Sequence, residues 1–418
     1  MNYYAPLTSE NGFFEGHDPY ELIERYGSPL YVYNEKILRQ KCVEMKKLLK
    51  HKNFKVHYSV KANGNIELLK IIKNESVNVD AVSHGEIYIE KNAGFCSSQI
   101  LFVGNNLTRA EMSAVINEGV RISVDSLSQL KQFGEINKGG EVIVRINPGF
   151  GSGHHQKVIT AGNYTKFGIS YTDCSKIKEI ADSYGLKIIG LNMHIGSLFH
   201  DKDIYISSIK ILLSALNEFP EAYIFDLGGG FGVSYNKIEG VKDHDLSKLF
   251  RHVDKLIRDW SLSNDRKLEI IIEPGRYISA ECGVLLGTVS SIKSNYMQKY
   301  IGTDIGFNVI ARTAMYDAYH DIEVYRKKIP GTNHRISFEK CNIVGNICET
   351  GDYIAKDKLL PSITEGDLIG VMSAGAYGFS MSSNYNGRLR PAEILIGRNK
   401  NVRLIRKRET FEQLMNNF

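Results

Sequence analysis

Apolar side chains occupy every second position from Phe54 to Val60, which is the period of a β-strand. A turn-like stretch follows, and the helical pattern from Ile66 to Lys73 comes after it. Lys61 therefore stands at the carboxyl end of a predicted strand. A lysine amine in a partly dry pocket can lose its proton and form a Schiff base, although a strand-end lysine taken alone is more often simply solvated.

The same pattern recurs along the first two thirds of the chain. Strand-like runs occur at 54–60, 77–82, 100–103, 121–125, 141–147, 187–195, 222–227 and 268–273, and helical patterns such as 108–118, 203–218 and 246–260 lie between most of them. This alternation predicts βαβ units and a parallel sheet, either a closed (β/α)8 barrel or a doubly wound open sheet.

The positions of polar, charged and glycine residues favour the barrel over the open sheet. These residues follow the ends of several predicted strands, whereas an open sheet would gather them at a single switch point. They are Lys61, Ser83-His84-Gly85-Glu86, His194, Gly228-Gly229-Gly230 and Glu273-Pro274-Gly275-Arg276.

The period changes near residue 280. Short β-type runs punctuated by Gly, Pro and Asn follow, at 284–292, 300–304, 336–344, 367–372, 392–396 and 402–405. We therefore predict an α/β barrel domain over residues 27–279 and a mostly β domain over 280–418, and we expect residues 1–26 to join the β domain.

Composition narrows the function classes only a little. The net charge of +5 is spread along 418 residues, and its densest cluster, 403–408, lies on a predicted edge strand, so nucleic-acid binding gains little support. The six cysteines show neither CxxC spacing nor pairing with nearby histidines, so neither a zinc site nor a disulfide framework is indicated. With no signal-like N-terminus and no membrane-length apolar run, we expect a cytoplasmic protein without a membrane span.

Two glycine turns carry candidate chemistry. Gly228, Gly229 and Gly230 leave a strand together, and such glycines let backbone amides approach a phosphate, although a tight barrel turn explains them equally well. The Gly275 turn on the next strand favours phosphate, because barrels often bind it after strands 7 and 8. Glu273 could keep a pyridine nitrogen protonated or simply pair with Arg276.

Other candidates are weaker when taken singly. His194 could stack on a ring but is more often a structural histidine, and Cys348 is more often an inert small side chain than a proton donor. Glu349 and Tyr377 add a carboxylate and a phenol in turn-rich sequence. The loop Gly151–His155 is rich in histidine, and we interpret it as a barrel-mouth loop in preference to a metal site.

Taken together, the motifs resemble the fold-type III pyridoxal-phosphate decarboxylases over nearly the whole chain. The stretches that carry the resemblance are Tyr58–Asn63, His194–Ser197, Gly228–Gly232, Glu273–Arg276, Tyr316–His320, Cys348–Asp352 and Gly375–Asn386. The resemblance implies an alanine-racemase-like barrel that binds pyridoxal 5'-phosphate, a β domain, and a homodimer with shared active sites.

The resemblance also implies roles for individual residues. Lys61 would bind the cofactor covalently and Cys348 of the partner subunit would donate a proton. The implied cofactor-binding residues are Lys61, His194, Gly228, Gly229, Gly230, Glu273, Gly275, Arg276 and Tyr377. The implied substrate-binding residues are Arg276, Arg312, Tyr316, Glu349 and Tyr377.

The implied reaction is a carboxy-lyase reaction in lysine biosynthesis, in which meso-diaminopimelate loses CO2 to give L-lysine. A decarboxylase of ornithine, arginine or a carboxylated polyamine, an amino-acid racemase, and a non-catalytic cofactor carrier are the alternatives. Glu273 argues against a racemase, because a protonated ring suits loss of CO2. Thr313 and Leu198-Phe199 depart from the family pattern and bear on the choice of substrate.

Overall fold

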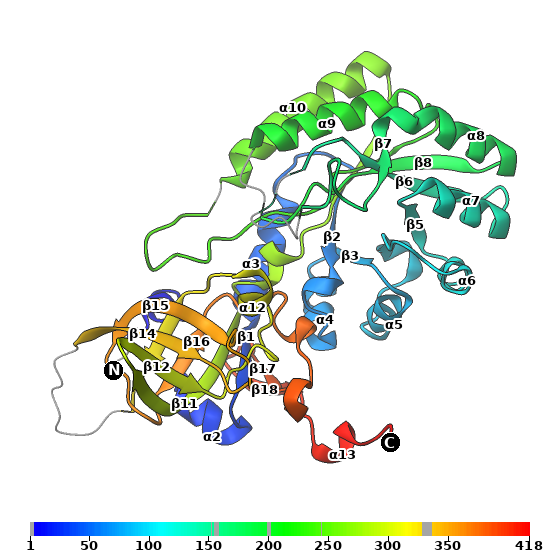
Figure 1. Ribbon diagram of the computed structural model, residues 1–418. Helices are drawn as coiled ribbons and strands as arrows, with labels where there is room; N and C mark the ends of the chain where they lie inside the picture. The colour runs from blue at the N-terminus through cyan, green and yellow to red at the C-terminus, as the bar shows by residue number, and fades with distance from the viewer. Residues whose placement is uncertain (1–3, 152, 154–158, 199–201, 244, 328–336) are drawn as a thin grey trace. The chain divides into compact units, whose positions relative to one another are not determined.

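The computed structural model describes residues 4–151, 153, 159–198, 202–243, 245–327 and 337–418. The chain forms two compact units (Figure 1). The barrel unit consists of Arg39–Val233 and Asp243–Ile278, and the β unit consists of Met1–Leu38, Ser234–Lys242 and Ser279–Phe418.

Eight parallel strands close the barrel, and this confirms the predicted fold. Their order is β5-β4-β3-β2-β10-β9-β8-β6, and a further pairing of β5 with β6 completes the ring. The strands are β2 (Phe54–Ser59), β3 (Asn78–Ala81), β4 (Ile100–Phe102), β5 (Arg121–Val124), β6 (Glu141–Asn147), β8 (Lys187–Asn192), β9 (Ile224–Asp226) and β10 (Glu269–Ile272), and a short β7 (Ile169–Ser170) pairs with β6. Each of the eight lies within one of the predicted runs.

Helices alternate with these strands. They are α4 (Ile66–Asn74), α5 (His84–Asn92), α6 (Arg109–Asn117), α7 (Leu127–Ile136), α8 (Cys174–Tyr184), α9 (Lys202–Leu216), α10 (Leu246–Asn264) and the short α11 (Arg276–Ser279). Side chains of Asn65, Ser83 and Thr108 accept hydrogen bonds from the first turns of α4, α5 and α6, which fixes where each helix begins. Helices α9 and α10 run side by side on the outside of the barrel (Figure 1).

Branched aliphatic side chains fill the barrel interior. Leu101, Ile143, Ile189, Ile224 and Ile271 come from five different strands and form one buried cluster. Packed barrels of this kind leave chemistry to the carboxyl ends of their strands. The functional side chains of the barrel unit should therefore lie where the strands end.

The β unit is a nine-stranded sheet. Its main path is β15-β14-β12-β11-β1-β17-β18, and β16 pairs with β11 and β13. The strands are β1 (Leu30–Asn34), β11 (Gly283–Asn295), β12 (Gln298–Thr303), β13 (Ile322–Tyr325), β14 (Phe338–Val344), β15 (Tyr353–Pro361), β16 (Leu368–Val371), β17 (Ala392–Ile396) and β18 (Val402–Arg406). The basic β18 is the last strand of the path, as predicted for an edge strand. Strands β13 and β15 were not predicted.

The N-terminal boundary of the barrel differs from the prediction at residue 27. Strand β1 pairs antiparallel with β11 and parallel with β17, so it belongs to the sheet of the β unit. All five of its residues are buried, and such a strand shows no alternation that would reveal its sheet. The division falls inside α3 (Glu35–Lys46), after Leu38.

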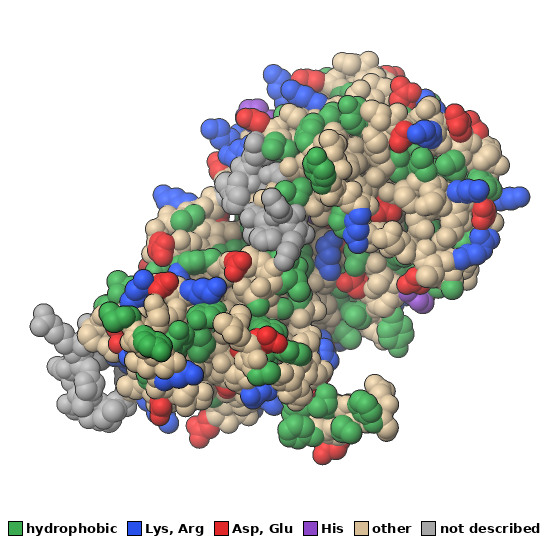
Figure 2. Space-filling view, in the orientation of Figure 1, with side chains coloured by type: hydrophobic (Ala, Val, Ile, Leu, Met, Phe, Trp, Pro, Cys, Tyr) green, Lys and Arg blue, Asp and Glu red, His purple; other side chains and the backbone are tan. Residues whose placement is uncertain are grey.

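Short helices complete the β unit. They are α1 (Pro6–Glu10), α2 (Pro19–Tyr26), α12 (Arg312–Tyr316) and α13 (Phe411–Leu414). Short 3-10 turns occur in both units, at η1 (Val60–Ala62), η2 (Ser97–Gln99), η4 (Tyr171–Asp173), η5 (Phe379–Met381) and η6 (Tyr385–Gly387). On the visible surface of each unit, basic and acidic side chains are interspersed (Figure 2). No helix within the described residues is long and apolar enough to cross a membrane.

Candidate active site

Lys61 lies in the turn that follows β2. The strand ends at Ser59, and Lys61 is the middle residue of η1. The turn is held by Tyr58, whose hydroxyl donates to the carbonyl of Asn63 at 3.2 Å, and by the Asn63 side chain, which accepts from the Asn65 amide at 3.0 Å. Local hydrogen bonds thus place Lys61 at the carboxyl end of the barrel, as predicted.

Carboxyl groups from neighbouring elements surround Lys61. Burial raises the pKa of Asp80 well above its usual value, the charge of Glu273 raises it further, and the positive charge of Lys61 opposes both. The hydroxyl of Ser59 donates to Asp80 at 2.6 Å. Burial also raises the pKa of Glu86, and Lys61 again opposes the shift. The lysine thus lies in a partly dry, acidic environment.

Asp226 and Glu273 form a buried pair at the ends of β9 and β10. Burial raises the pKa of both carboxyl groups, and the charge of Asp226 raises the pKa of Glu273 further. Asp226 Oδ1 accepts from the Gly228 amide at 2.9 Å. Asp226 Oδ2 and Glu273 Oε1 are buried and find no hydrogen-bond donor within the described parts of the chain. A shared proton, or an added N–H donor, would satisfy these oxygens.

The glycine turn after β9 packs against both neighbouring strand ends. A Cβ on Gly228, where φ is +64°, would overlap the carbonyl oxygen of Met193, and one on Gly229 would overlap the carbonyl oxygen of Glu273. The Gly228 amide donates to Asp226 and the Gly229 amide donates to His194 Nδ1 at 3.0 Å. Two of the three amides expected to reach a phosphate are therefore engaged by protein groups, one of them within the turn and the other at the end of β8.

His194 is held as a neutral ring. Its Nδ1 accepts from the Gly229 amide, so the proton of the neutral ring is on Nε2. Desolvation in the barrel, followed by the charges of Lys61 and Arg145, lowers the pKa of His194 well below its usual value. A neutral imidazole facing the lysine can pack against a cofactor ring without adding charge.

Arg276 begins α11, directly after the Gly275 turn. Its guanidinium is buried and donates to the Ser197 hydroxyl at 3.0 Å. Lys61, His194, the glycine turn, Glu273 and Arg276 thus all lie at strand ends of one unit.

Arg312, in the β unit, is equally buried. Its Nη1 donates to His320 Nε2 at 2.8 Å, and its guanidinium lies 4.5 Å from the ring centre of Tyr235. Thr313, the residue that departs from the family pattern, donates its hydroxyl to the Ile310 carbonyl at 3.3 Å. The Thr313 hydroxyl therefore bonds to the backbone just before α12 (Arg312–Tyr316).

Cys348 and Glu349 are exposed on a loop between β14 and β15. Asp352 holds this loop, because its buried carboxylate accepts from the amides of Phe307 at 2.7 Å and Ile347 at 2.8 Å. The Glu349 carboxylate accepts from the Tyr385 hydroxyl at 2.6 Å. A thiol and a carboxylate are thus presented together on a fixed turn.

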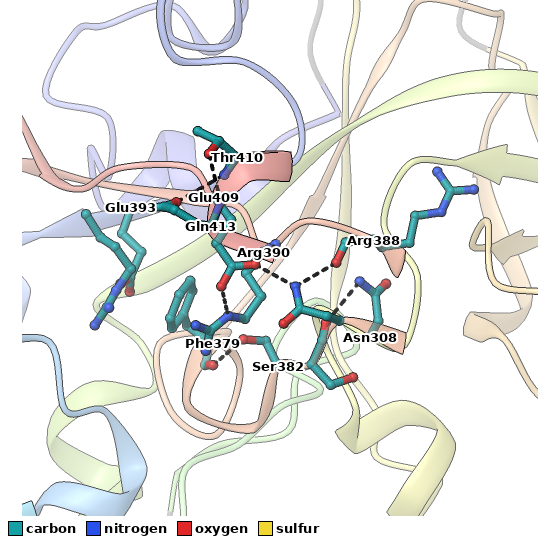
Figure 3. A network of polar contacts seen from close by, with 12 residues as sticks. Asn308, Phe379, Ser382, Arg388, Arg390, Glu393, Glu409, Thr410 and Gln413 are labelled. Atoms are coloured by element: carbon teal, nitrogen blue, oxygen red, sulfur yellow. Dashed lines mark hydrogen bonds and ion pairs between the residues drawn. The ribbon is translucent and has the colours of Figure 1, made fainter. Parts of the chain in front are cut away.

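The segment from Tyr377 to Arg390 supports the Cys348 loop. Asn386 accepts from the Cys348 amide at 3.0 Å, and Arg388 donates to the Asn346 carbonyl at 3.0 Å. Glu409 in turn anchors the segment, because its carboxylate accepts from Asn384 at 2.6 Å and from Arg390 Nε at 2.5 Å (Figure 3). The C-terminal residues therefore contribute to the shape of this loop.

The predicted residues thus fall into two sets. The barrel unit brings together Lys61, His194, the glycines, Glu273 and Arg276, and the β unit carries Arg312, Tyr316, Cys348, Glu349 and Tyr377. Leu198, beside the barrel set, adopts a left-handed conformation with φ of +55°. Phe199, His154 and His155 lie outside the described residues.

Several residues of these sets were not predicted from the sequence as site residues. Asp80, Asp226 and Arg145 adjoin the barrel residues, and His320 and Asp352 adjoin those of the β unit. His320 and Asp352 stand within the motifs given above, and Asp226 stands two residues before the glycine turn, so their positions could have drawn attention to them. Asp80 and Arg145 stand on strands without a local motif and become apparent only through the closure of the barrel.

Comparison with known proteins identifies the class. Residues 35–280 match the model of the pyridoxal-dependent decarboxylase family, pyridoxal binding domain. The chain therefore belongs to the pyridoxal-dependent decarboxylases, and its cofactor is pyridoxal phosphate.

Within this family the chain is similar to particular enzymes over its full length. It is 38% identical over 413 residues to diaminopimelate decarboxylase of Methanothermobacter thermautotrophicus, covering 96% of this chain and 94% of the relative. The crystal structure of diaminopimelate decarboxylase from M. jannaschii in co-complex with L-lysine has a TM-score of 0.85 at 31% identity, covering 96% and 94%. A lysine/ornithine decarboxylase from Vibrio vulnificus, complexed with putrescine, has a TM-score of 0.77 at 21% identity, covering 91% of this chain and 97% of that one. That last similarity shows the fold alone.

Proposed function

We propose that the protein decarboxylates meso-diaminopimelate to L-lysine and CO2 and thereby serves lysine biosynthesis. The observation that carries the reaction type is the buried Glu273 Oε1, which has no hydrogen-bond donor within the described residues and suits a protonated ring nitrogen, in the same unit as Lys61 and the neutral His194. The similarity to diaminopimelate decarboxylases at up to 38% identity supports the substrate. A lysine, ornithine or arginine decarboxylase is the second candidate, and here only the fold supports it.

The barrel residues fit pyridoxal phosphate. The unsatisfied Glu273 Oε1 suits the N–H of a protonated pyridine ring, and the neutral His194 ring suits stacking. Lys61 would bind the cofactor covalently. Gly228 and Gly229 would shape the phosphate site by close packing, and Gly230, Gly275, Arg276 and Tyr377 would adjoin it. Bound there, pyridoxal phosphate would supply an electron sink for the decarboxylation, and Glu273 would keep its ring nitrogen protonated.

The β unit supplies the groups suited to the substrate. A distal carboxylate needs a fixed cation, and an arginine fork can bind it with two charge-assisted hydrogen bonds. The buried Arg312 is the foremost candidate, and Arg276 is the second. Glu349 would bind the distal ammonium group, and Tyr316 and Tyr377 would line the pocket.

Cys348 would complete the reaction. Loss of CO2 leaves a carbanion, and the exposed thiol of Cys348 would return a proton to that carbon. We propose that Cys348 acts in the site of the partner subunit of a homodimer. We also propose a cytoplasmic location, which the six free cysteines support.

An assay of the holoenzyme on four substrates tests the proposed function. Release of CO2 should be fast with meso-diaminopimelate and slow with lysine, ornithine and arginine. A substrate without the distal carboxylate forgoes the charge-assisted hydrogen bonds to the buried arginine, and each such bond is worth about 1.5–3 kcal/mol. Preference for ornithine or arginine in the wild type would contradict the assignment.

Replacing Arg312 with Leu tests the basis of that preference. The variant should lose far more activity on meso-diaminopimelate than on lysine or ornithine, because only the first needs the lost charge. Arg326→Leu is the control, since Arg326 also lies in the β unit and faces Asp367 at 3.8 Å. The control should keep the wild-type preference, and equal losses on all substrates in Arg312→Leu would contradict the role of Arg312.

A further inference from the structure

We propose that His320 is a positioning residue that sets the orientation of the Arg312 guanidinium and thereby the specificity for a distal carboxylate. This inference rests on the proposed function, in which Arg312 binds that carboxylate. His320 would touch Arg312 and not the substrate.

The two side chains form a buried pair. Arg312 is the first residue of α12 and is 2% exposed, and His320, in the segment before β13, is 1% exposed. Arg312 Nη1 lies 2.8 Å from His320 Nε2, and His320 Nδ1 lies 2.7 Å from the Met372 carbonyl oxygen. The Met372 amide donates to the Asp321 carbonyl at 2.9 Å, so the Met372 backbone that contacts His320 is itself held in place.

These contacts allow only one form of the histidine ring. A guanidinium has donors and no acceptor, so His320 Nε2 must present its lone pair to Arg312. Nδ1 must then carry the proton and donate it to Met372. The ring is neutral, and its two nitrogens bridge the arginine to the end of β16 (Leu368–Val371).

Tyr235 fixes the pair from a second direction. Its ring lies 4.5 Å from the Arg312 guanidinium and packs edge-on against the His320 ring, with ring centres 5.0 Å apart and planes at 73°. The aromatic face favours the cation, and the hydrogen bond to His320 prevents the plane of the fork from turning. With one edge of the planar fork fixed, the direction of the rest is fixed, as two-point binding of a carboxylate requires.

Two substitutions separate this role from simple packing. In His320→Gln, the side-chain oxygen can take the position of Nε2 and still accept from Arg312. In His320→Asn, the shorter amide reaches only the position of Nδ1, so it can donate to Met372 but cannot reach Arg312. Both variants are uncharged, and a purely structural role would lower their stability, more in His320→Asn, without changing the preference among substrates.

The expected result is a split between the two variants. His320→Asn should raise KM for meso-diaminopimelate on the order of tenfold or more, the change that loss of one hydrogen bond to a charged group produces. The effect on kcat should be smaller, and the relative rate on lysine or ornithine should rise. His320→Gln should stay within about threefold of wild type. Cofactor absorbance and thermal unfolding show whether each variant is folded and loaded.

Several outcomes would overturn the inference. Equal KM values in the two variants, or a wild-type KM in His320→Asn, would remove the positioning role. If Arg312→Leu keeps the wild-type substrate preference, the proposed function of Arg312 fails as well. If Arg312→Leu loses that preference while His320→Asn does not, only the role of His320 fails.

A measurement on the wild-type protein reports the ring directly and needs one folded variant only to assign the signals. In protein labelled with ¹⁵N-histidine, the His320 signals are those missing from His320→Gln or, failing that, from His320→Asn or His320→Phe. We expect an unprotonated Nε2 and a protonated Nδ1 at neutral pH. A protonated Nε2 could not accept from Arg312 and would contradict the proposal.

Discussion

At the scale of single residues, Glu90 is a buried side chain whose environment disfavours its charge. It lies on α5, is 0% exposed, and neither carboxyl oxygen has a hydrogen-bond partner in the described part of the chain. Burial, together with the smaller effects of the charges of Asp80 and Glu86, raises the pKa of Glu90 to about 9. The folded protein therefore keeps a proton that the unfolded chain releases near the ordinary glutamate pKa.

This difference makes stability depend on pH. Below about pH 4.5 Glu90 is protonated in both the folded and the unfolded state, and the folded protein has its full free energy of unfolding. As the pH rises towards 9, the unfolded chain releases this proton and the free energy of unfolding falls. At pH 7 the loss amounts to about 3 kcal/mol. Glu90→Gln cannot ionise, so the variant should unfold at a higher temperature than wild type at pH 8, and the difference should narrow towards pH 5.

Thermal unfolding of both proteins from pH 5 to 8 measures the effect. Glu179→Gln, on the exposed face of α8, is the control for the change of charge. It should change the unfolding temperature little at any pH. A difference between Glu90→Gln and wild type that does not depend on pH would contradict the assigned shift.

At the scale of elements, the turn after β9 requires glycine at residue 228 for two reasons, the positive φ and the lack of space for a Cβ. Gly228 has φ of +64°, and Gly185, the residue that ends α8, has φ of +66°. A Cβ on Gly185 meets nothing within 4 Å, whereas a Cβ on Gly228 would overlap the Met193 carbonyl. Gly185→Ala should therefore cost only about 1–2 kcal/mol of stability, the cost of a left-handed alanine.

Gly228→Ala should cost clearly more, because its Cβ also displaces backbone at the end of β8. The shift would move His194 and Asp226, so the variant should also retain less pyridoxal phosphate after dialysis. Urea unfolding gives the stability, and absorbance of the bound cofactor gives its occupancy. Equal losses in the two variants would mean that the positive φ alone accounts for the glycine.

Sequence periodicity predicted the elements of the barrel well and those of the β unit less well. Each barrel strand is a short apolar run followed by a helical pattern, so the residues next to it in the sequence are enough to recognise it. Strand β1 is buried throughout, and its assignment depends on pairing with β11 and β17, far away in the chain. In β15, residues Lys356, Asp357 and Lys358 interrupt the apolar pattern, so the run does not read as a strand.

The site follows the same division. Lys61, His194 and Glu273 could be predicted because each stands in a compact motif at a strand end. Asp80 and Arg145 could not, since their importance comes from three-dimensional proximity to Lys61 and Glu273. The Gly228 amide bonds locally to Asp226, whereas the Gly229 amide bonds to His194 at the end of a neighbouring strand. The second bond cannot be predicted from the glycines themselves, so the sequence alone suggests that both amides are available to a phosphate.

At the scale of the whole molecule, the question is whether each site draws on two subunits. We expect a homodimer in which Lys61 of one subunit works with Cys348 of the other. Lys61→Ala and Cys348→Ala should each be inactive alone. In a mixture of equal amounts, random exchange makes about half of the dimers hybrid, and each hybrid holds one intact site of two. Activity should therefore recover to about a quarter of wild type.

The matched control is a mixture of Lys61→Ala with Glu273→Gln. Both residues belong to the barrel unit of one subunit, and the charge of Lys61 acts directly on Glu273. Every site of such a hybrid therefore keeps one defect, and mixing should restore no activity beyond that of the parents. Differently tagged subunits and affinity capture show that exchange has taken place. If exchange is complete and the Lys61→Ala and Cys348→Ala mixture stays inactive, Cys348 does not act across the dimer. If Cys348→Ala is active alone, another group supplies the proton.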